Sequence, residues 1–171
     1  KKINNVIIET SSHGLDQKRL HHINFKGAIF TNFSQDHLDY HGNMKSYLNA
    51  KLILFREVLN KKSTIISDKE IKQFSLIKRI AKKKNFKLLD ITQERKKIMS
   101  NYSNFINDFK TKNLAMAIKA AKLCYLKENL IYNALKKIKD VNGRLELVKK
   151  YPNNVKVFVD YAHTPDALLK T

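Results

Sequence analysis

Short runs of apolar and β-branched residues alternate along this chain with longer segments whose apolar residues recur at helical spacing. Four runs have the length of a strand, and they are NVIIE, GAIFTN, STIIS and FKLLDI. Helical patterns occupy 43–59 and 69–84 between them. Strands separated by helices can pair in parallel, because each helix carries the chain back to the starting edge of the sheet. The sequence therefore predicts an α/β fold, with a mostly parallel sheet and flanking helices.

Two further helices are predicted before the turn DVNGR, at 111–126 and 127–139. Thr111 is expected to cap the first, because its hydroxyl can accept a hydrogen bond from the free N–H groups at a helix start. The single cysteine, Cys124, falls within this apolar pattern and is expected to be a core residue. One cysteine excludes both an internal disulfide and a metal site built from several cysteines.

The chain changes character after DVNGR. RLELV follows, then a predicted strand over VKVFVDY, then a helix in HTPDALLKT with Thr164 as its cap and Pro165 at its first position. We therefore expect one domain at 1–142, and at 143–171 a hinge followed by the start of a second domain.

The chain has a formal net charge of +19, from 34 Lys+Arg against 15 Asp+Glu. Such a charge is typical of nucleic-acid-binding modules. Most of the excess, however, is lysine spread through helical segments, with few interleaved arginines or aromatics, which favours a solvated lysine-rich surface. No apolar run approaches the roughly 18 residues of a membrane span, and no signal peptide precedes the first predicted strand. We expect a cytoplasmic monomer without nucleic-acid or membrane partners.

Candidate ligand-binding residues follow the first predicted strand. Glu9 closes NVIIE, and the small polar residues TSSH come next. Open α/β sheets bind ligands at the carboxyl ends of their strands, and a carboxylate there can hold Mg²⁺, which prefers oxygen ligands. The alternative is that Glu9 is a solvent-facing strand end.

A second candidate group, QDHLDYH, follows GAIFTN. His37 and His41 are four residues apart, a spacing that could place both on one face of a short helix as metal ligands. Asp36 and Asp39 could fix the imidazole tautomers or cap a turn. The same pattern is compatible with purely structural roles for two of these four residues.

Lys51 falls inside the apolar stripe of the next predicted helix, between Leu48 and Phe55. A lysine at such a position must extend its ammonium to solvent, form an ion pair, or be chemically altered. The pattern alone leaves these three outcomes open.

Five stretches resemble, in order, the landmark motifs of the Mur ligases, and they are ETSSHGLDQKRL, FTNFSQDHLDYHGNMKSYLNAKLILF, NLAMAIKAA, VNGRLE and VDYAHTPDAL. The resemblance spans almost the entire chain. Folylpolyglutamate synthetases are related enzymes, but DYHG together with DYAHTPDAL favours the branch that forms the muramyl tripeptide. The resemblance implies an incomplete ATP-binding central domain and the start of a Rossmann-like C-terminal domain. The family's glycine-rich phosphate loop would lie upstream of Glu9 and is absent from these residues, so we expect the chain alone to be inactive.

The reaction implied by this resemblance is ATP-dependent amide formation through an acyl phosphate in peptidoglycan synthesis. ATP would phosphorylate the D-glutamyl carboxylate of UDP-MurNAc-L-Ala-D-Glu. The amine of a diamino acid, meso-diaminopimelate in preference to L-lysine, would then attack the carbonyl carbon. Two Mg²⁺ ions would neutralise the phosphates and the developing oxyanions.

The resemblance also implies residue roles. Glu9 and His37 would each ligate a Mg²⁺, and Lys51 would be carbamylated, serving with His37 as a metal-site and catalytic residue. Ser11, Gln17 and Arg19 would hold the muramyl dipeptide. ATP would contact Asn113, Arg144, Asp160 and His163.

One motif departs from the family pattern. Gly-x-Phe-Asn-x-x-Asn reads NDFKTKN here, which keeps Phe109 and Asn113 but places Asn107 and Lys110 at the other two positions. Packing or turn roles are implied for His13, His21, His22, Asp39 and His41. Two other functions are retained: a nucleic-acid-binding module with a contiguous basic face, and a phosphohydrolase using Asp36, His37 and His41 as metal ligands.

Overall fold

A computed structural model describes residues 3–101, 108–139 and 141–169. At its centre lies a three-stranded sheet of β1 (Gly27–Phe30), β2 (Thr64–Ser67) and β3 (Lys87–Asp90), in the order β1-β2-β3. Both strand pairs are parallel, with Ile65 of β2 opposite Ala28 on one side and Leu88 on the other. The predicted parallel α/β arrangement is confirmed.

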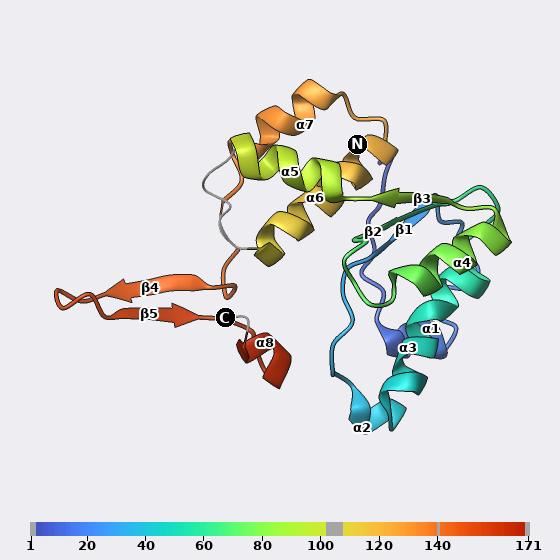
Figure 1. Ribbon diagram of the computed structural model, residues 1–171, viewed down its shortest axis with the longest axis horizontal. Helices are drawn as coiled ribbons and strands as arrows, with labels where there is room; N and C mark the ends of the chain where they lie inside the picture. The colour runs from blue at the N-terminus through green and yellow to red at the C-terminus, as the bar shows by residue number, and fades with distance from the viewer. Residues whose placement is uncertain (1–2, 102–107, 140, 170–171) are drawn as a thin grey trace.

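Helices cover both faces of this sheet (Figure 1). On one face lie α1 (Ser12–Asp16), α3 (Met44–Ile53), the π-helix η1 (Leu54–Val58) and α4 (Phe74–Lys84). On the other lie α5 (Thr92–Asn101), α6 (Asp108–Leu123) and α7 (Glu128–Leu135). The short helix α2 (Leu38–His41) precedes α3.

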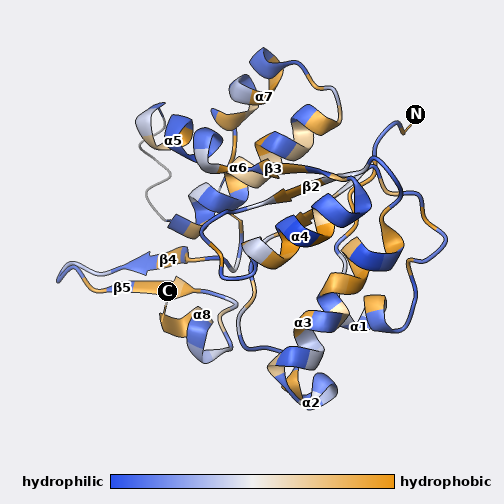
Figure 2. Ribbon diagram, turned by 45° about the vertical axis from the view of Figure 1, so that its right-hand side comes forward, coloured by the Kyte–Doolittle hydropathy of each residue, from blue (hydrophilic) through white to orange (hydrophobic). Residues whose placement is uncertain are grey.

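Alternation along β2 builds the two apolar layers. Ile65, 0% exposed, belongs to the cluster beneath α3, η1 and α4, while its neighbour Ile66, 1% exposed, belongs to the cluster beneath α5, α6 and α7. Successive strand residues point to opposite faces, so a strand covered on both sides is apolar throughout. Figure 2 shows this pattern as hydrophobic colouring of β2 and β3 between helices with hydrophilic outer surfaces.

The helix that carries Lys51 has a defined start and an irregular end. The Asn43 side chain accepts a hydrogen bond from the Ser46 backbone N–H at 2.9 Å and so caps α3. At Leu54 the α-helix passes into η1, which ends before Leu59. Such π-turns occur mostly as short insertions inside α-helices and are frequent near functional sites. The helix predicted over 43–59 is thus present, with an unpredicted π-turn.

The first predicted strand, NVIIE, is not formed. Residues 3–11 are extended but pair with no other strand among the described residues, and Val6 and Ile7 are 74% and 87% exposed. A strand needs a neighbour to satisfy its N–H and C=O groups, which local apolar spacing does not supply. Glu9 therefore lies in an exposed extended segment, not at a strand end.

Three details differ on the α5 side and in α4. Helix α5, built from TQERKKIMSN, was not predicted. Thr111 lies inside α6 and is 2% exposed, so the prediction that it caps a helix was wrong. Helix α4 begins at Phe74, five residues after the predicted start at 69.

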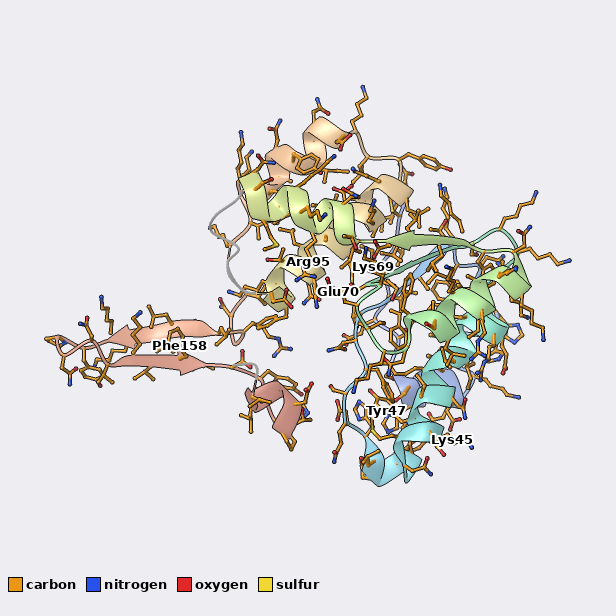
Figure 3. The ribbon with its side chains drawn as sticks, in the orientation of Figure 1. Lys45, Tyr47, Lys69, Glu70, Arg95 and Phe158 are labelled. Carbon is orange, nitrogen blue, oxygen red and sulfur yellow. The ribbon has the colours of Figure 1, made fainter. Side chains whose placement is uncertain are left out.

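A separate hairpin follows the three-stranded sheet. Strands β4 (Glu146–Lys150) and β5 (Lys156–Val159) pair antiparallel, and α8 (Pro165–Leu169) comes next. The Thr164 hydroxyl accepts a hydrogen bond from the Ala167 N–H at 3.3 Å, which confirms the predicted cap. Phe158 of β5, labelled in Figure 3, is 48% exposed.

No helix within the described ranges is long and apolar enough to span a bilayer.

Candidate functional site

Three histidines gather beneath the loop that leaves β1. His13 comes from α1, His37 precedes α2 and His41 ends α2. The His13 ring centroid lies 4.9 Å from that of His37 and 5.4 Å from that of His41. The loop after β1 and the short helix α1 therefore converge on one place, although His13 and His37 are 24 positions apart in the sequence.

Asp36 holds His37 in its position. The Asp36 carboxylate accepts a hydrogen bond from the His37 backbone N–H at 2.8 Å, and its other oxygen lies 3.5 Å from Nε2 of the same histidine. His37 adopts a left-handed backbone conformation, with φ of 52°, which is uncommon outside glycine and favoured only when neighbours impose it. A carboxylate beside an imidazole orients the ring and selects its tautomer.

His41 is occupied by protein contacts. Its Nε2 lies 2.9 Å from Oγ of Ser12, and its ring stacks on Tyr47 with the centroids 5.3 Å apart. Burial, followed by the nearby His13, lowers the pKa of His41, which favours its neutral form. Among the residues that the structure describes, no three His, Cys, Asp or Glu side chains are grouped as metal ligands. These contacts favour packing roles for His13 and His41 over the phosphohydrolase alternative.

Lys51 does not extend freely into solvent. Its Nζ lies 3.5 Å from the Tyr47 hydroxyl and 5.9 Å from the centroid of the Phe30 ring. Burial lowers the pKa of Lys51, and the negative charge of Asp36 opposes that effect without cancelling it. A larger fraction of this amine is therefore uncharged than for an exposed lysine, and the uncharged form is the one that reacts with CO₂.

Tyr47 contacts both Lys51 and the histidines. Figure 3 shows Tyr47 on the inner side of α3 and Lys45 on its outer side. The Tyr47 ring centroid lies 5.8 Å from that of His37, in an edge-to-face arrangement. Burial and the charge of Asp36 both raise the pKa of the Tyr47 hydroxyl. Lys51 and His37, to which the family resemblance assigns metal-binding roles, thus contact the same tyrosine.

The three residues expected to hold the peptide substrate surround α1. The Ser11 hydroxyl caps this helix, accepting a hydrogen bond from the Gly14 N–H at 3.0 Å. Gln17 is the C-cap residue of the same helix, and Arg19 follows it in the chain. All three residues are exposed. The capping contact gives Ser11 a structural role that the sequence did not indicate.

The residues expected near ATP come from two separate places. Asn113 is exposed on α6. Arg144 lies over the Tyr161 ring, with its guanidinium carbon 4.5 Å from the ring centroid. The Asp160 carboxylate accepts hydrogen bonds from the backbone N–H groups of Leu145 and Ala162, which ties together the two ends of the β4–β5 hairpin.

His163 lies opposite His37 across an open pocket. Residues 35–38 form one wall of this pocket, and 163–165 form the other. His163 Nδ1 is 2.9 Å from the Tyr161 carbonyl oxygen, which leaves Nε2 as the ring nitrogen not engaged in that contact. The structure therefore brings together two predicted site residues that are 126 positions apart.

A charged network that the sequence did not reveal lies at the carboxyl end of β2. Lys112 Nζ is within 3.4 Å of carboxylate oxygens of Asp68, Glu70 and Asp108. Arg95 forms ion pairs with the last two of these carboxylates. Figure 3 shows Glu70 and Arg95 side by side. Because Lys112 precedes Asn113, this network fixes the turn of α6 that carries the expected adenine-side residue.

A second buried network joins α5, α6 and α7. Glu94 is 3% exposed, and its carboxylate accepts hydrogen bonds from Lys122 Nζ at 2.8 Å and from the Tyr132 hydroxyl at 2.7 Å. These contacts lie far from the histidine cluster along the chain and serve the packing of the three helices. Local spacing could have indicated the Asp108–Lys112 pair, which is four residues apart on α6, but not the contacts that join different elements.

Comparison with known proteins assigns a family to this arrangement. The family model for the Mur ligase middle domain matches residues 1–138. The chain is 38% identical to the UDP-N-acetylmuramoyl-L-alanyl-D-glutamate--2,6-diaminopimelate ligase of Rickettsia bellii (strain RML369-C), covering 98% of this chain and 39% of that protein. It is 40% identical to the ligase of the same name from Haemophilus influenzae (strain PittEE), covering 95% and 38% respectively. The chain therefore spans about two fifths of the length of these curated relatives.

Solved structures give a consistent result. A ligase structure of the same name superposes with a TM-score of 0.67 at 26% identity, covering 94% of this chain and 37% of that one. MurF from Acinetobacter baumannii superposes with a TM-score of 0.67 at 15% identity, covering 85% and 36%, which is a likeness of fold.

Proposed function

This chain belongs to the Mur ligase family, through the middle domain of that family, and from this premise we propose that it is part of an ATP-dependent amide ligase of peptidoglycan synthesis. The ligase adds a diamino acid to UDP-MurNAc-L-Ala-D-Glu through an acyl phosphate. The observation that carries the proposal is the position of the half-buried Lys51. Its amine and the His37 ring both contact the Tyr47 side chain. We infer meso-diaminopimelate as the diamino acid, because the relatives at 38% and 40% identity are named as diaminopimelate ligases.

The proposed domain boundary lies between the three-stranded parallel sheet and the β4–β5 hairpin. Residues 1–142 form the larger part of the ATP-binding central domain, around the parallel sheet. Residues 143–171 form a hinge and the start of the C-terminal domain. Gly143, with φ of +68°, supports a turn at this boundary, because glycine adopts positive φ without steric cost.

We infer that a modified lysine forms part of a Mg²⁺ site, because the described residues offer no group of three His, Cys, Asp or Glu side chains for this purpose. Lys51 with a lowered pKa is suited to form a carbamate, which converts a cation into an anionic oxygen ligand. His37 and Glu9 supply the other side chains of the chain that would hold the two ions. Bound Mg²⁺ would neutralise the phosphate groups and the oxyanions that develop during acyl transfer.

The chain's own residues would position the two substrates, the muramyl dipeptide and the nucleotide. Arg19, exposed after α1, is suited to bind an anionic group of the muramyl dipeptide, with Gln17 and the Ser11 hydroxyl beside it. Asn113, Arg144 and Asp160 are proposed to contact the nucleotide, and His163 lines the same pocket as His37. Phosphoryl transfer depends mainly on such positioning and on charge neutralisation.

The test is a substrate-dependence assay with the full-length ligase. Phosphate release is measured with ATP, Mg²⁺ and UDP-MurNAc-L-Ala-D-Glu, together with meso-diaminopimelate, L-lysine or glycine. We expect release that needs both the dipeptide and the diamino acid, and a kcat/KM for meso-diaminopimelate at least about 100-fold above that for L-lysine, because L-lysine lacks the second carboxylate and would leave its binding partners unpaired. Phosphate release that does not depend on the dipeptide would contradict the proposed reaction, and equal use of L-lysine would contradict the assigned diamino acid.

A further inference from the structure

Two lysines of α6 each form an ion pair with a carboxylate that is almost fully buried. Lys112 Nζ lies 3.2 Å from Oδ2 of Asp68, which directly follows β2. Lys122 Nζ lies 2.8 Å from Oε1 of Glu94, on α5. The two carboxylates are alike in burial, and both lysine side chains are partly exposed. The lysines are nevertheless about 15 Å apart along the helix, because each residue adds about 1.5 Å.

Asp68 lies at the edge of the sheet where open α/β folds bind ligands. It follows the strand that is paired on both sides, and its Oδ1 accepts a hydrogen bond from the Glu70 N–H at 2.9 Å. The other oxygen, Oδ2, is the one that Lys112 contacts. Lys112 also pairs with Glu70 and Asp108, but these carboxylates are 51% and 61% exposed, so solvent weakens both contacts. The Asp68 carboxylate is therefore the fixed point to which this part of α6 is attached.

The ion pair determines how α6 is rotated about its own axis. Asn113 follows Lys112 and is exposed, and successive helical side chains leave the axis about 100° apart. Ala115 and Met116 are buried against the sheet and hold the helix in place, but hydrophobic burial has no preferred direction. A contact between Lys112 and one fixed carboxylate does have a direction. It therefore sets the direction in which Asn113 points.

We propose that Asp68 and Lys112 are positioning residues for the nucleotide, because their ion pair sets the rotation of α6 that presents Asn113. The inference rests on the proposed function, in which Asn113 contacts ATP. Asp68 and Lys112 act through Asn113 and do not themselves touch the nucleotide in this account.

The Glu94–Lys122 pair is a matched control on the same helix. Lys122→Met and Lys112→Met each leave one buried carboxylate without its lysine, so both should destabilise the fold. Lys122 is nine residues beyond Asn113 and pairs with residues of α5 and α7. A loss that comes only from general destabilisation should therefore appear in both variants, and a loss that comes from the position of Asn113 only in Lys112→Met.

The experiment measures the Kd of the full-length ligase for ADP with Mg²⁺ by isothermal titration calorimetry. Urea unfolding selects a temperature at which every variant compared is folded, and Asp68→Asn breaks the same pair from its other side. We expect Lys112→Met and Asp68→Asn each to raise the Kd about tenfold, as for the loss of one hydrogen bond to the nucleotide. Lys122→Met should stay within about twofold of wild type. In steady-state assays Lys112→Met should raise KM for ATP and leave kcat within about twofold, since a binding contact alone is lost.

A double variant tests whether the pair acts through Asn113. Asn113→Ala should raise the Kd for ADP by about the same factor as Lys112→Met. The Lys112→Met/Asn113→Ala double variant should bind no more weakly than either single variant, because both changes remove one and the same contact. Losses that multiply in the double variant would overturn the proposal, since the pair would then affect the nucleotide by another route.

The remaining outcomes separate this proposal from the function on which it rests. If Asn113→Ala raises the Kd but Lys112→Met and Asp68→Asn do so no more than Lys122→Met, the positioning role is overturned and the nucleotide role of Asn113 stands. If Asn113→Ala leaves the Kd unchanged, the assignment of Asn113 to the nucleotide fails and the positioning role fails with it. Absence of ADP binding in the wild-type ligase would contradict the proposed function itself.

Discussion

The Lys112 ammonium lies 3.2 Å from Oδ2 of Asp68, a carboxylate that is 1% exposed. Asp68 directly follows β2, and Lys112 is one residue before Asn113 on α6. This ion pair therefore joins the end of the central strand to the helix expected to face the nucleotide. Burial tends to lower the pKa of Lys112, but hydrogen bonds to Asp108 and Asp68 outweigh it and raise that pKa.

We predict that Lys112→Met destabilises the fold, because it leaves the Asp68 charge buried without its partner. The expected loss is about 3 kcal/mol in the free energy of unfolding, as for other broken buried pairs. Urea unfolding measures it, and the Asp68→Asn/Lys112→Met double variant should recover more than half of the loss. If the double variant is less stable than Lys112→Met, the pair does not act as described. Lys78→Met, at an exposed position of α4, is the surface-lysine comparison.

The buried Glu94 carboxylate should make stability depend on acid pH. Burial alone would raise the pKa of Glu94, but hydrogen bonds from Lys122 and Tyr132 outweigh it and lower that pKa below 4.5. A carboxyl with a lowered folded-state pKa contributes stability above its unfolded pKa, and this contribution is lost as pH falls through the folded value. We expect the free energy of unfolding to fall below about pH 4.5, and Glu94→Gln should flatten that fall. An unchanged acid dependence in Glu94→Gln would assign it to other groups.

The same network has an alkaline counterpart at Tyr132. Burial and the hydrogen bond to Glu94 raise the pKa of Tyr132 to about 12. A group with a raised folded-state pKa contributes stability below its unfolded pKa, near 10 for tyrosine, and loses it as pH rises toward 12. Tyr132→Phe should reduce the loss of stability between these two pH values in urea titrations. An equally steep alkaline loss in the variant would contradict this assignment.

Lys51→Ala in the full-length ligase should lower kcat by at least about 100-fold, because it would remove the proposed carbamate that holds a Mg²⁺ ion. Acetate, which can supply a carboxylate in the vacated space, should restore part of the activity. Formate and chloride serve as smaller and non-carboxylate comparisons. Wild-type turnover in the variant would show that Lys51 only packs against Phe30 and Tyr47.

Gly27→Ala should disturb the contact of β1 with β2 and α6. An added Cβ would lie 2.5 Å from Cδ2 of Leu123 and 2.7 Å from the Thr64 carbonyl oxygen. The leucine can rotate, but the strand carbonyl cannot move without breaking the sheet, so we expect a loss of about 1–3 kcal/mol in unfolding free energy. Gly14→Ala, whose added carbon would meet Ser11 Oγ at 3.2 Å, tests a milder contact in the same assay. Equal stability of Gly27→Ala and wild type would mean that β1 and β2 are less closely packed than described.

The strands of the central sheet could be predicted because their information is local. STIIS and FKLLDI contain β-branched or apolar residues in most positions, with consecutive apolar residues at their centres as doubly covered strands have, and both form. NVIIE has the same composition but no pairing partner among the described residues, so a local pattern could not decide it. Helix α5 was missed because its sequence is mostly charged and polar, with Ile98 as the buried apolar residue.

The sequence could indicate which residues belong to the candidate site, but not most of the contacts between them. The interruption of an apolar stripe indicated that Lys51 is unusual, and its burial bears this out. The contact of Tyr47 with His37 could not be inferred, because Tyr47 reads as one more apolar residue of that stripe. The opposition of His37 and His163 depends on how the hairpin and α8 fold back, which no short motif encodes. The assigned roles in metal, peptide and nucleotide binding stay predictions.

The π-turn that follows Lys51 changes which residues of this continuous helix share a face. The buried face after the turn is therefore rotated relative to the face before it. In a regular α-helix, residues that share a buried face are spaced three or four apart, so a lysine placed to face the histidines would dictate which later residues reach the core. The wider turn at Leu54–Val58 resets this relation, and Leu54, Phe55, Val58 and Leu59 are all buried. The buried residues at the end of the helix can thus pack in the core without changing the direction in which Lys51 points. Deleting one residue from the π-turn should restore regular helical spacing between Lys51 and the buried residues after it. If those residues keep their places in the core, Lys51 should then rotate away from Tyr47.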